Sequence, residues 1–327
     1  MPGGLWRRGL RILFIGNSRI GDFVLASGLL SHLVETHPDA RLSVVCGPSC
    51  VPLLAEVPGV EEVIALRKRR HHRHWFDLWR RVVGTRWDLV VDLRNSAVSR
   101  LVRAGEVRRL RRAGRPSHRV EEIAGVLDLD PPPSPRIWLG PDQRAFAERL
   151  LPDGPPVLAI GPGATHPPKQ WPAERFAELA TILTGPAGIL PGARVAVLGA
   201  PDEREAARPV LAAIPPERRL DLMDGVPILE AAAVIERCTL YVGNDNGQMH
   251  VSAAVGTPTL GLFGPTPAFH YRPWGARCAF VQTDRPFEDL SAVHETAHRA
   301  RENLMESLPV AKVAEAARIL LAPMGGT

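Results

Sequence analysis

Short apolar runs alternate with stretches of helical spacing along the first half of the chain. Five apolar residues between positions 22 and 37 recur at i, i+3 and i+4 intervals, which predicts a helix with one buried face. They are Phe23, Ala26, Leu29, Leu30 and Leu33. Another helix is predicted over 75–83, and strands are predicted over 11–16, 41–47, 62–66 and 87–93. Such alternation is typical of a parallel, doubly wound sheet.

The second half repeats this alternation after a proline-rich break. Proline clusters occupy 130–135 and 151–156, on either side of a short predicted helix over 141–151. We therefore place a domain boundary near residue 153, which divides the chain into 1–153 and 154–327. The strands predicted in the second half cover 157–160, 193–199, 220–223, 239–243 and 259–263, and the helices cover 172–183, 203–213, 228–237, 247–255 and 309–321. The last helix could pack back onto the first domain.

Composition narrows the protein class. Apolar residues make up 45% and charged residues 23% of the chain, as in folded globular proteins. The four cysteines form no C-x-x-C pair, which argues against a zinc site, a redox motif or a disulfide scaffold. The sequence contains no run of about 18 apolar residues, the length that a membrane span needs. We expect a cytoplasmic protein.

The net charge of +5 is unevenly distributed. Residues 1–156 carry 25 basic and 17 acidic side chains, whereas residues 157–327 carry 15 and 18. A basic first half suits an anionic ligand or a membrane surface, although simple arginine richness is the alternative. The basic stretch 67–81 contains interleaved aromatic residues and could be a solvated face, a contact for anionic lipid or a nucleic-acid patch. We expect no nucleic-acid partner.

A loop whose residues could bind a ligand or take part in catalysis follows the first predicted strand. It contains Gly16, Ser18, Arg19 and Gly21 and leads to Asp22 at a helix start. Asp22 could cap that helix, or it could hold a carboxylate over a ligand crevice and accept a proton. The two glycines do not form a phosphate loop, because no Lys-Ser or Lys-Thr follows the second.

Two loops of the second half have features of anion sites. The segment 161–172 contains Thr165 and Lys169, one of only three lysines, whose ammonium could bind a diphosphate or simply face solvent. In Tyr241–His250, a predicted strand gives way to Asp245, Asn246 and Gly247, a composition that favours an anion site at a helix N-terminus. His250 taken alone could be a packed helix residue.

Three segments, in this order, resemble glycosyltransferase family 9, the bacterial ADP-heptose:lipopolysaccharide heptosyltransferases. They are S-R-I-G-D-F-V-L-A at 18–26, K-Q-W-P at 169–172 and G-N-D-N-G-Q-M-H-V-S-A-A-V-G-T-P-T-L-G-L-F-G-P-T at 243–266. The third segment is long and specific. The similarity in layout extends from residue 11 to about residue 320.

The resemblance implies a GT-B fold, in which two Rossmann-like domains with parallel sheets face a central cleft. It implies an inverting transfer of heptose from ADP-heptose to a lipopolysaccharide core acceptor, with no metal or other cofactor. The first domain would bind an anionic, lipid-linked saccharide acceptor, with Ser18 and Arg19 in the acceptor loop and Asp22 as general base. Because that acceptor is a lipid, peripheral contact with the inner membrane is expected.

The second domain would bind the nucleotide-sugar donor. Lys169 would stabilise the departing diphosphate, and the other donor residues implied by the match are Thr165, Asp245, Asn246, Gly247 and His250. Asn246 departs from the family, which usually has Ser or Thr there, so a hydroxyl contact with phosphate is lost and donor preference could shift. Glu203, beside Asp202, is a weaker candidate for the donor ribose, by analogy with dinucleotide folds.

Other functions fit parts of the same pattern. Another GT-B transferase, an epimerase that uses a different nucleotide-sugar, and a non-catalytic nucleotide-sugar binding module all remain open. A dehydrogenase is disfavoured, because no G-x-G-x-x-G follows the first strand with an acidic residue about 20 positions later. The D-x-D at Asp128–Asp130 lies in the proline-rich segment and is interpreted as a helix end, not a metal site.

Overall fold

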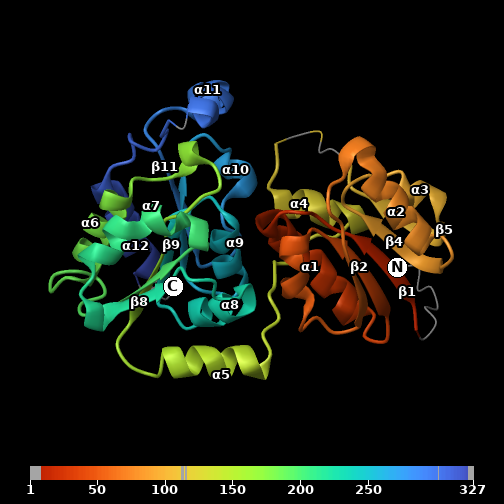
Figure 1. The fold of residues 1–327 in the computed structure, drawn as a ribbon, viewed down its shortest axis with the longest axis horizontal. Helices are drawn as coiled ribbons and strands as arrows, with labels where there is room; N and C mark the ends of the chain where they lie inside the picture. Colours follow the sequence, from red (N-terminus) through yellow and green to blue (C-terminus); the bar gives the residue numbers. More distant parts are fainter. Residues whose placement is uncertain (1–8, 112–113, 115, 301, 323–327) are drawn as a thin grey trace. The chain divides into compact units, whose positions relative to one another are not determined.

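The computed structural model describes residues 9–111, 114, 116–300 and 302–322 of the chain (Figure 1). These residues form two compact units, one that ends at residue 138 and one that begins at residue 139. Each unit is an α/β domain built around its own parallel sheet. The parallel sheets predicted from strand–helix alternation are thereby confirmed.

The first unit contains a five-stranded sheet with the strand order β3-β2-β1-β4-β5, in which every neighbouring pair is parallel. Its strands are β1 (Arg11–Ile15), β2 (Arg41–Cys46), β3 (Val60–Ala65), β4 (Arg86–Asp92) and β5 (Arg103–Arg109). Its helices are α1 (Ile20–Thr36), α2 (Arg73–Val82), α3 (Val98–Leu101) and α4 (Arg119–Ala124). Ile12 to Ile15 of β1 are completely buried, as expected of a central parallel strand covered on both faces.

The second unit contains a six-stranded parallel sheet with the order β11-β10-β9-β6-β7-β8. Its strands are β6 (Val157–Gly161), β7 (Arg194–Leu198), β8 (Arg219–Leu222), β9 (Leu240–Asn244), β10 (Thr259–Phe263) and β11 (Cys278–Gln282). Its helices are α5 (Pro141–Leu150), α6 (Ala173–Thr184), α7 (Arg204–Ala213), α8 (Ile228–Glu236), α9 (Gly247–Ala254), α10 (Ala268–Tyr271), α11 (Phe287–Ala300) and α12 (Val310–Leu321). Trp171, Phe176 and Leu179 lie in a core that also includes β6, β7 and α12.

The sequence patterns missed the two edge strands β5 and β11. Five of the seven β5 residues are arginine, glutamate or glycine, so the strand has no apolar alternation to detect. β5 forms because its backbone pairs with β4 along its whole length, from Arg103 opposite Arg86 to Arg109 opposite Asp92. An edge strand is specified by its neighbour's hydrogen bonds more than by its own side chains.

The structure corrects the division of the chain. Helix α5 was assigned from the sequence to the first domain, but it packs against α8 and belongs to the second unit. Arg144 of α5 forms an ion pair with Glu236 of α8, which adds to this contact. The last helix, α12, packs on α6 and β11 of its own unit. The boundary therefore lies at 138–139, before the helix instead of after it.

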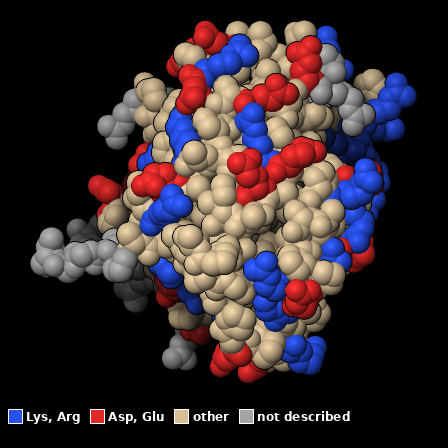
Figure 2. Space-filling model, turned by 90° about the vertical axis from the view of Figure 1, so that its left-hand side faces the viewer, with Lys and Arg blue, Asp and Glu red and all other residues tan. Residues whose placement is uncertain are grey.

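Charge is interspersed on the face of the molecule drawn in Figure 2, where acidic and basic side chains neighbour each other among uncharged ones. Ion pairs of the second unit include Arg204–Asp221 and Arg237–Asp153. The basic stretch at 67–81 forms α2 and the turn before it, with most of its arginines exposed. Among the described residues, no helix is long and apolar enough to cross a membrane.

Candidate functional site

The strand order of the second sheet reverses between β6 and β9. Along the chain β6 is followed by its neighbour β7, whereas β9 pairs with the opposite side of β6. Open parallel sheets bind ligands beyond the carboxyl ends of the strands at such a reversal. The loops that leave these two strands begin after Gly161 and Asn244. The topology thus brings two of the predicted site segments to one edge of the sheet.

Lys169 and Asp245, one from each loop, meet in an ion pair. The Lys169 Nζ atom lies 2.8 Å from Asp245 Oδ2, although the residues are 76 positions apart in sequence. The two side chains are only 19% and 8% exposed, so solvent screens their attraction weakly. Asp245 therefore holds the lysine ammonium in place at the start of α9.

Two asparagines tie the same loops together. Asn246 caps α9, since its Oδ1 accepts a hydrogen bond from the Met249 amide at 3.0 Å. Its Nδ2 donates to the Gly163 carbonyl at 2.7 Å. The buried Asn244 donates to the Pro162 carbonyl and accepts from the Trp171 amide. The Asn246 side chain therefore caps the helix and also bonds to the facing loop.

The first turn of α9 has the properties of an anion site. The Asn246 side chain satisfies the Met249 amide, whereas the Gly247 and Gln248 amides precede the first intrahelical hydrogen bond. Such free amides and the helix dipole favour a negative charge. Lys169 adds a cation beside them through its contact with Asp245.

Glu203 lies against the loop that follows β6. Its carboxylate contacts the position where a side chain at Gly163 would begin, and it accepts a hydrogen bond from the Ala200 amide at 2.9 Å. Burial raises the pKa of Glu203. The buried Tyr241 hydroxyl similarly occupies the space beside Gly161 and Gly243, and burial raises the pKa of that phenol. Larger residues at these glycines would displace the groups beneath the loop.

The remaining predicted donor residues differ in exposure. Thr165 is exposed on the loop after β6, whereas His250 is 4% exposed within α9. The sequence did not single out Gln248 or Thr266, which follow β9 and β10. Gln248 Oε1 and Thr266 Oγ1 are buried without a hydrogen-bond partner among the described residues, which makes them candidate ligand contacts. Both residues lie in the segment 243–266 that carries the family resemblance, but nothing in the sequence distinguished them from their neighbours there.

The first sheet has its own reversal between β1 and β4, and Asp22 lies beside it. Asp22 is the third residue of α1, whose N-cap is Arg19, so the helix-cap interpretation of Asp22 is wrong. Its side chain is partly exposed and makes no hydrogen bond or ion pair with another described residue. The carboxylate is therefore not committed to holding the helix start.

Ser18 is linked to a residue that the sequence did not indicate. Arg94, just after β4, donates from Nη1 to Ser18 Oγ at 2.8 Å, and its guanidinium lies 5.6 Å from the centre of the Trp75 ring. The buried Asp92 fixes the turn by accepting hydrogen bonds from the Arg94 and Ser96 amides. Arg19 is exposed. The loops after β1 and β4 thus meet through Arg94.

Metal-ligating groups do not cluster in the part of the chain that the structure describes. No group of three or more His, Cys, Asp or Glu side chains there could hold an ion. Asp128 of the D-x-D lies at the end of a 3-10 turn, as its interpretation as a helix end predicts. It also forms an ion pair with Arg108.

The chain is similar to known proteins over most of its length. The model of glycosyltransferase family 9 (heptosyltransferase) matches residues 106–297. Lipooligosaccharide heptosyltransferase 2 of Haemophilus influenzae is 26% identical over 314 residues, which cover 84% of this chain and 88% of that protein. Lipopolysaccharide heptosyltransferase 2 of Escherichia coli is 28% identical over 297 residues, with coverages of 79% and 83%.

Solved structures share the fold. A glycosyltransferase family 9 protein from Veillonella parvula matches with a TM-score of 0.76 and 22% identity, over 95% of this chain and 97% of its own. The ADP-heptose lps heptosyltransferase II of E. coli matches with a TM-score of 0.73 and 23% identity, over 95% and 98%. The predicted fold class, two Rossmann-like domains of the GT-B type, is confirmed.

Proposed function

The chain belongs to glycosyltransferase family 9 and is a glycosyltransferase, and on that basis we propose that it transfers heptose from ADP-heptose to a lipopolysaccharide core acceptor. The relatives support this choice, since those named above are lipopolysaccharide or lipooligosaccharide heptosyltransferases. One similar solved structure is an ADP-heptose heptosyltransferase. The identity of the transferred sugar as heptose is inferred from the names of these relatives.

The observation that carries the donor site is the Lys169–Asp245 ion pair at the start of α9. A donor diphosphate bound there would contact the lysine ammonium and would accept hydrogen bonds from the free amides of Gly247 and Gln248. Asp245 would keep the ammonium oriented before the donor binds. Thr165, Asn246 and His250 lie on the same two elements as candidate donor contacts, and Glu203 lies beside the loop as the candidate for the ribose.

The proposed reaction inverts the anomeric carbon in one displacement. Asp22 removes the proton from the attacking acceptor hydroxyl, whose oxygen forms a bond to the anomeric carbon of the donor sugar. The bond from that carbon to the diphosphate oxygen breaks, and ADP leaves with the electron pair. Lys169 and the α9 amides stabilise the developing charge, so the proposal requires no metal. Asp22 suits the base role because it caps nothing and has no ion-pair partner among the described residues.

The acceptor belongs to the first unit in this proposal. Ser18 and Arg19 border Asp22, and the unit is rich in arginine, which suits an anionic saccharide. A lipid-linked acceptor would place the enzyme at the cytoplasmic face of the inner membrane, in peripheral contact with it. Fractionation of cell lysates tests this location, and recovery only in the membrane-free fraction at low salt would contradict the contact.

Turnover with defined donors tests the function. The protein is incubated with ADP-heptose and a heptose-deficient lipopolysaccharide core, and released ADP is measured. We expect ADP release only when both substrates are present. Thermal unfolding with ADP, UDP and GDP tests the nucleotide independently, since a ligand at 100 times its Kd adds about 2.7 kcal/mol. Stabilisation by UDP or GDP instead of ADP would contradict the heptose assignment. ADP binding without turnover would favour a non-catalytic binding module.

A further inference from the structure

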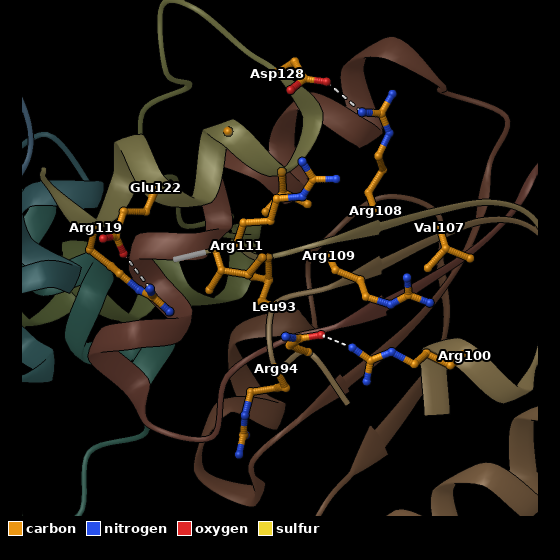
Figure 3. A pocket seen from close by; sticks show the side chains of 14 residues that line it. Leu93, Arg94, Arg100, Val107, Arg108, Arg109, Arg111, Arg119, Glu122 and Asp128 are labelled. Carbon is orange, nitrogen blue, oxygen red and sulfur yellow. Dashed lines mark hydrogen bonds and ion pairs between the residues drawn. The ribbon is translucent and has the colours of Figure 1, made fainter. Parts of the chain in front are cut away.

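A pocket of about 1050 Å³ opens in the first unit beyond the carboxyl ends of β4 and β5 (Figure 3). Its lining comes from the segments after these two strands, from the end of β5 itself, from α3 and α4, and from the turn that follows α4. Six arginines line it against two acidic residues, Glu122 and Asp128. The arginines are Arg94, Arg100, Arg108, Arg109, Arg111 and Arg119, and we call this the arginine pocket.

Two of the six guanidinium groups are compensated by carboxylates. Arg108 forms ion pairs with Glu106 at 2.5 Å and with Asp128 at 2.7 Å. Arg119 pairs with Glu122 at 2.8 Å, and both side chains are less than 20% exposed. Arg119 nevertheless has a buried Nε donor with no hydrogen-bond acceptor among the described residues. Even a paired arginine therefore leaves a donor unsatisfied.

The other four guanidinium groups have no carboxylate partner among the residues that the structure describes. Arg94 and Arg100 donate to neutral oxygens, Ser18 Oγ and Asn95 Oδ1. Arg109 donates to the hydroxyl and the carbonyl of Ser99. These bonds orient three of the four guanidinium groups but leave their charges uncompensated. Like charges held around a concave surface raise the local potential and attract an anion.

The composition of the pocket indicates the chemistry of that anion. We propose that the arginine pocket binds a phosphate monoester. Such a group carries between one and a half and two negative charges, roughly, and three acceptor oxygens. Several forked guanidinium donors match it better than they match a single carboxylate, which offers one charge and two oxygens. The volume of about 1050 Å³ leaves room for a sugar attached to the phosphate.

The pocket is connected to the proposed acceptor loop. Arg94 lines the pocket and also bonds Ser18, four positions before Asp22 in the chain. If the proposed transferase function is correct, the phosphate is therefore a substituent of the saccharide acceptor. Binding of the phosphate itself follows from the arginines alone and does not depend on that function.

Calorimetric titration of the full chain tests the proposal. The protein is first saturated with ADP, so that a donor diphosphate site is occupied, and is then titrated with glucose 6-phosphate, glucose and glucuronic acid. We expect binding of glucose 6-phosphate, about tenfold weaker binding of glucuronic acid, and no binding of glucose. Equal binding of glucuronic acid and glucose 6-phosphate, or binding of neither, would overturn the phosphate assignment.

Matched variants locate the binding. Arg100→Gln/Arg111→Gln removes two exposed pocket arginines, whereas Arg86→Gln/Arg103→Gln removes two exposed arginines at the opposite ends of the same strands β4 and β5. The pocket variant should bind glucose 6-phosphate about tenfold more weakly, the control should bind it normally, and ADP affinity should be unchanged in both. Equal effects of the two variants would refute the pocket.

A further experiment distinguishes a phosphorylated saccharide from a phosphate head group of a lipid as the source of the phosphate monoester. Phosphatidylcholine vesicles with and without phosphatidic acid are sedimented with each variant. Binding to phosphatidic acid vesicles that is lost in the pocket variant, without binding of glucose 6-phosphate, would overturn the assignment to a saccharide. Glucose 6-phosphate binding in a protein that lacks heptosyltransferase activity would support the pocket while contradicting the proposed function.

Discussion

Replacing Lys169 by methionine removes the ammonium of the Lys169–Asp245 ion pair and keeps most of the apolar stem. The two charged atoms are 2.8 Å apart, and Asp245 is 8% exposed. The variant therefore leaves a carboxylate in a poorly solvated position without its counter-ion. The same ammonium is the proposed contact of the donor diphosphate, so stability and donor affinity should both fall.

The magnitude follows from the distance and the burial. At an effective dielectric constant of about 20, the attraction across this separation is about 6 kcal/mol before desolvation. Desolvation of both ions offsets part of it, and breaking one partner of a buried pair costs about 3–5 kcal/mol. Because the Lys169 side chain is 19% exposed, we expect the lower end of this range, a loss of about 3 kcal/mol in the free energy of unfolding.

A matched lysine on the same unit provides the control. Lys312 forms an ion pair with Asp284 at 2.7 Å, but the side chains are 42% and 60% exposed. Lys312→Met should cost about 0–1 kcal/mol, since water solvates the remaining carboxylate. Urea unfolding without ligand measures the free energy of unfolding, and calorimetric titration with ADP measures donor-site affinity. Equal destabilisation by the two variants, or unchanged ADP affinity in Lys169→Met, would refute this reasoning.

The double variant Lys169→Met/Asp245→Asn separates stability from binding. Removing both charges eliminates the unpaired carboxylate, so most of the lost stability should return. ADP affinity should stay low, because the cation that would contact the diphosphate is still absent. Recovery of ADP affinity together with stability would mean that Lys169 acts only through the fold.

Three further predictions concern separate residues. Asp22→Asn should lower turnover about 10²- to 10⁴-fold and leave ADP affinity unchanged, whereas Asp39→Asn, an exposed site after α1, should change neither. Asn246→Ala should lower the free energy of unfolding by about 1 kcal/mol or more, because α9 loses its cap and the bond to Gly163, and Asn246→Ser should recover the cap but not that bond. Since burial raises the pKa of Glu203 above its ordinary 4.5, the folded protein holds this proton longer than the unfolded chain, so stability should fall as pH rises from 4.5 through the raised pKa. Urea unfolding across that range should show a smaller fall in Glu203→Gln, and identical pH profiles would contradict the burial argument.

The position of the candidate donor site illustrates why sheet topology matters for function. Both sheets reverse their strand order at a single place, between β1 and β4 and between β6 and β9. Asp22 lies in the first turn of α1, directly after the loop that leaves β1, and Lys169 lies in the segment that follows β6. Side chains from distant segments can converge there because no crossover helix covers the gap between the outgoing loops. Each sheet therefore has one reversal of strand order, and Asp22 and the candidate donor residues lie beside these reversals.

Local sequence patterns determined much of the fold and part of the site. Buried strands such as β1 and β6 are continuous apolar runs, and amphipathic helices such as α6 bury apolar positions at helical spacing, so each can be recognised within its own segment. Helix α1 instead buries an unbroken run from Phe23 to Ser31, so its burial is not confined to the one face that the spacing predicts. Asn246 before Gly247 likewise indicates a helix start, because a cap depends on residues only three positions apart. These features are local in sequence and need no knowledge of the remaining chain.

Only the tertiary structure decided which distant groups meet. The Lys169–Asp245 pair and the Arg94–Ser18 bond each join residues 76 positions apart, and their contact depends on the strand order of a sheet. The arginine pocket depends on β5, an edge strand without apolar alternation that is specified by pairing with β4. The boundary before α5 was decided by packing on α8. A sequence pattern reports the neighbours of a residue along the chain, whereas charge compensation, burial and edge pairing depend on neighbours in space.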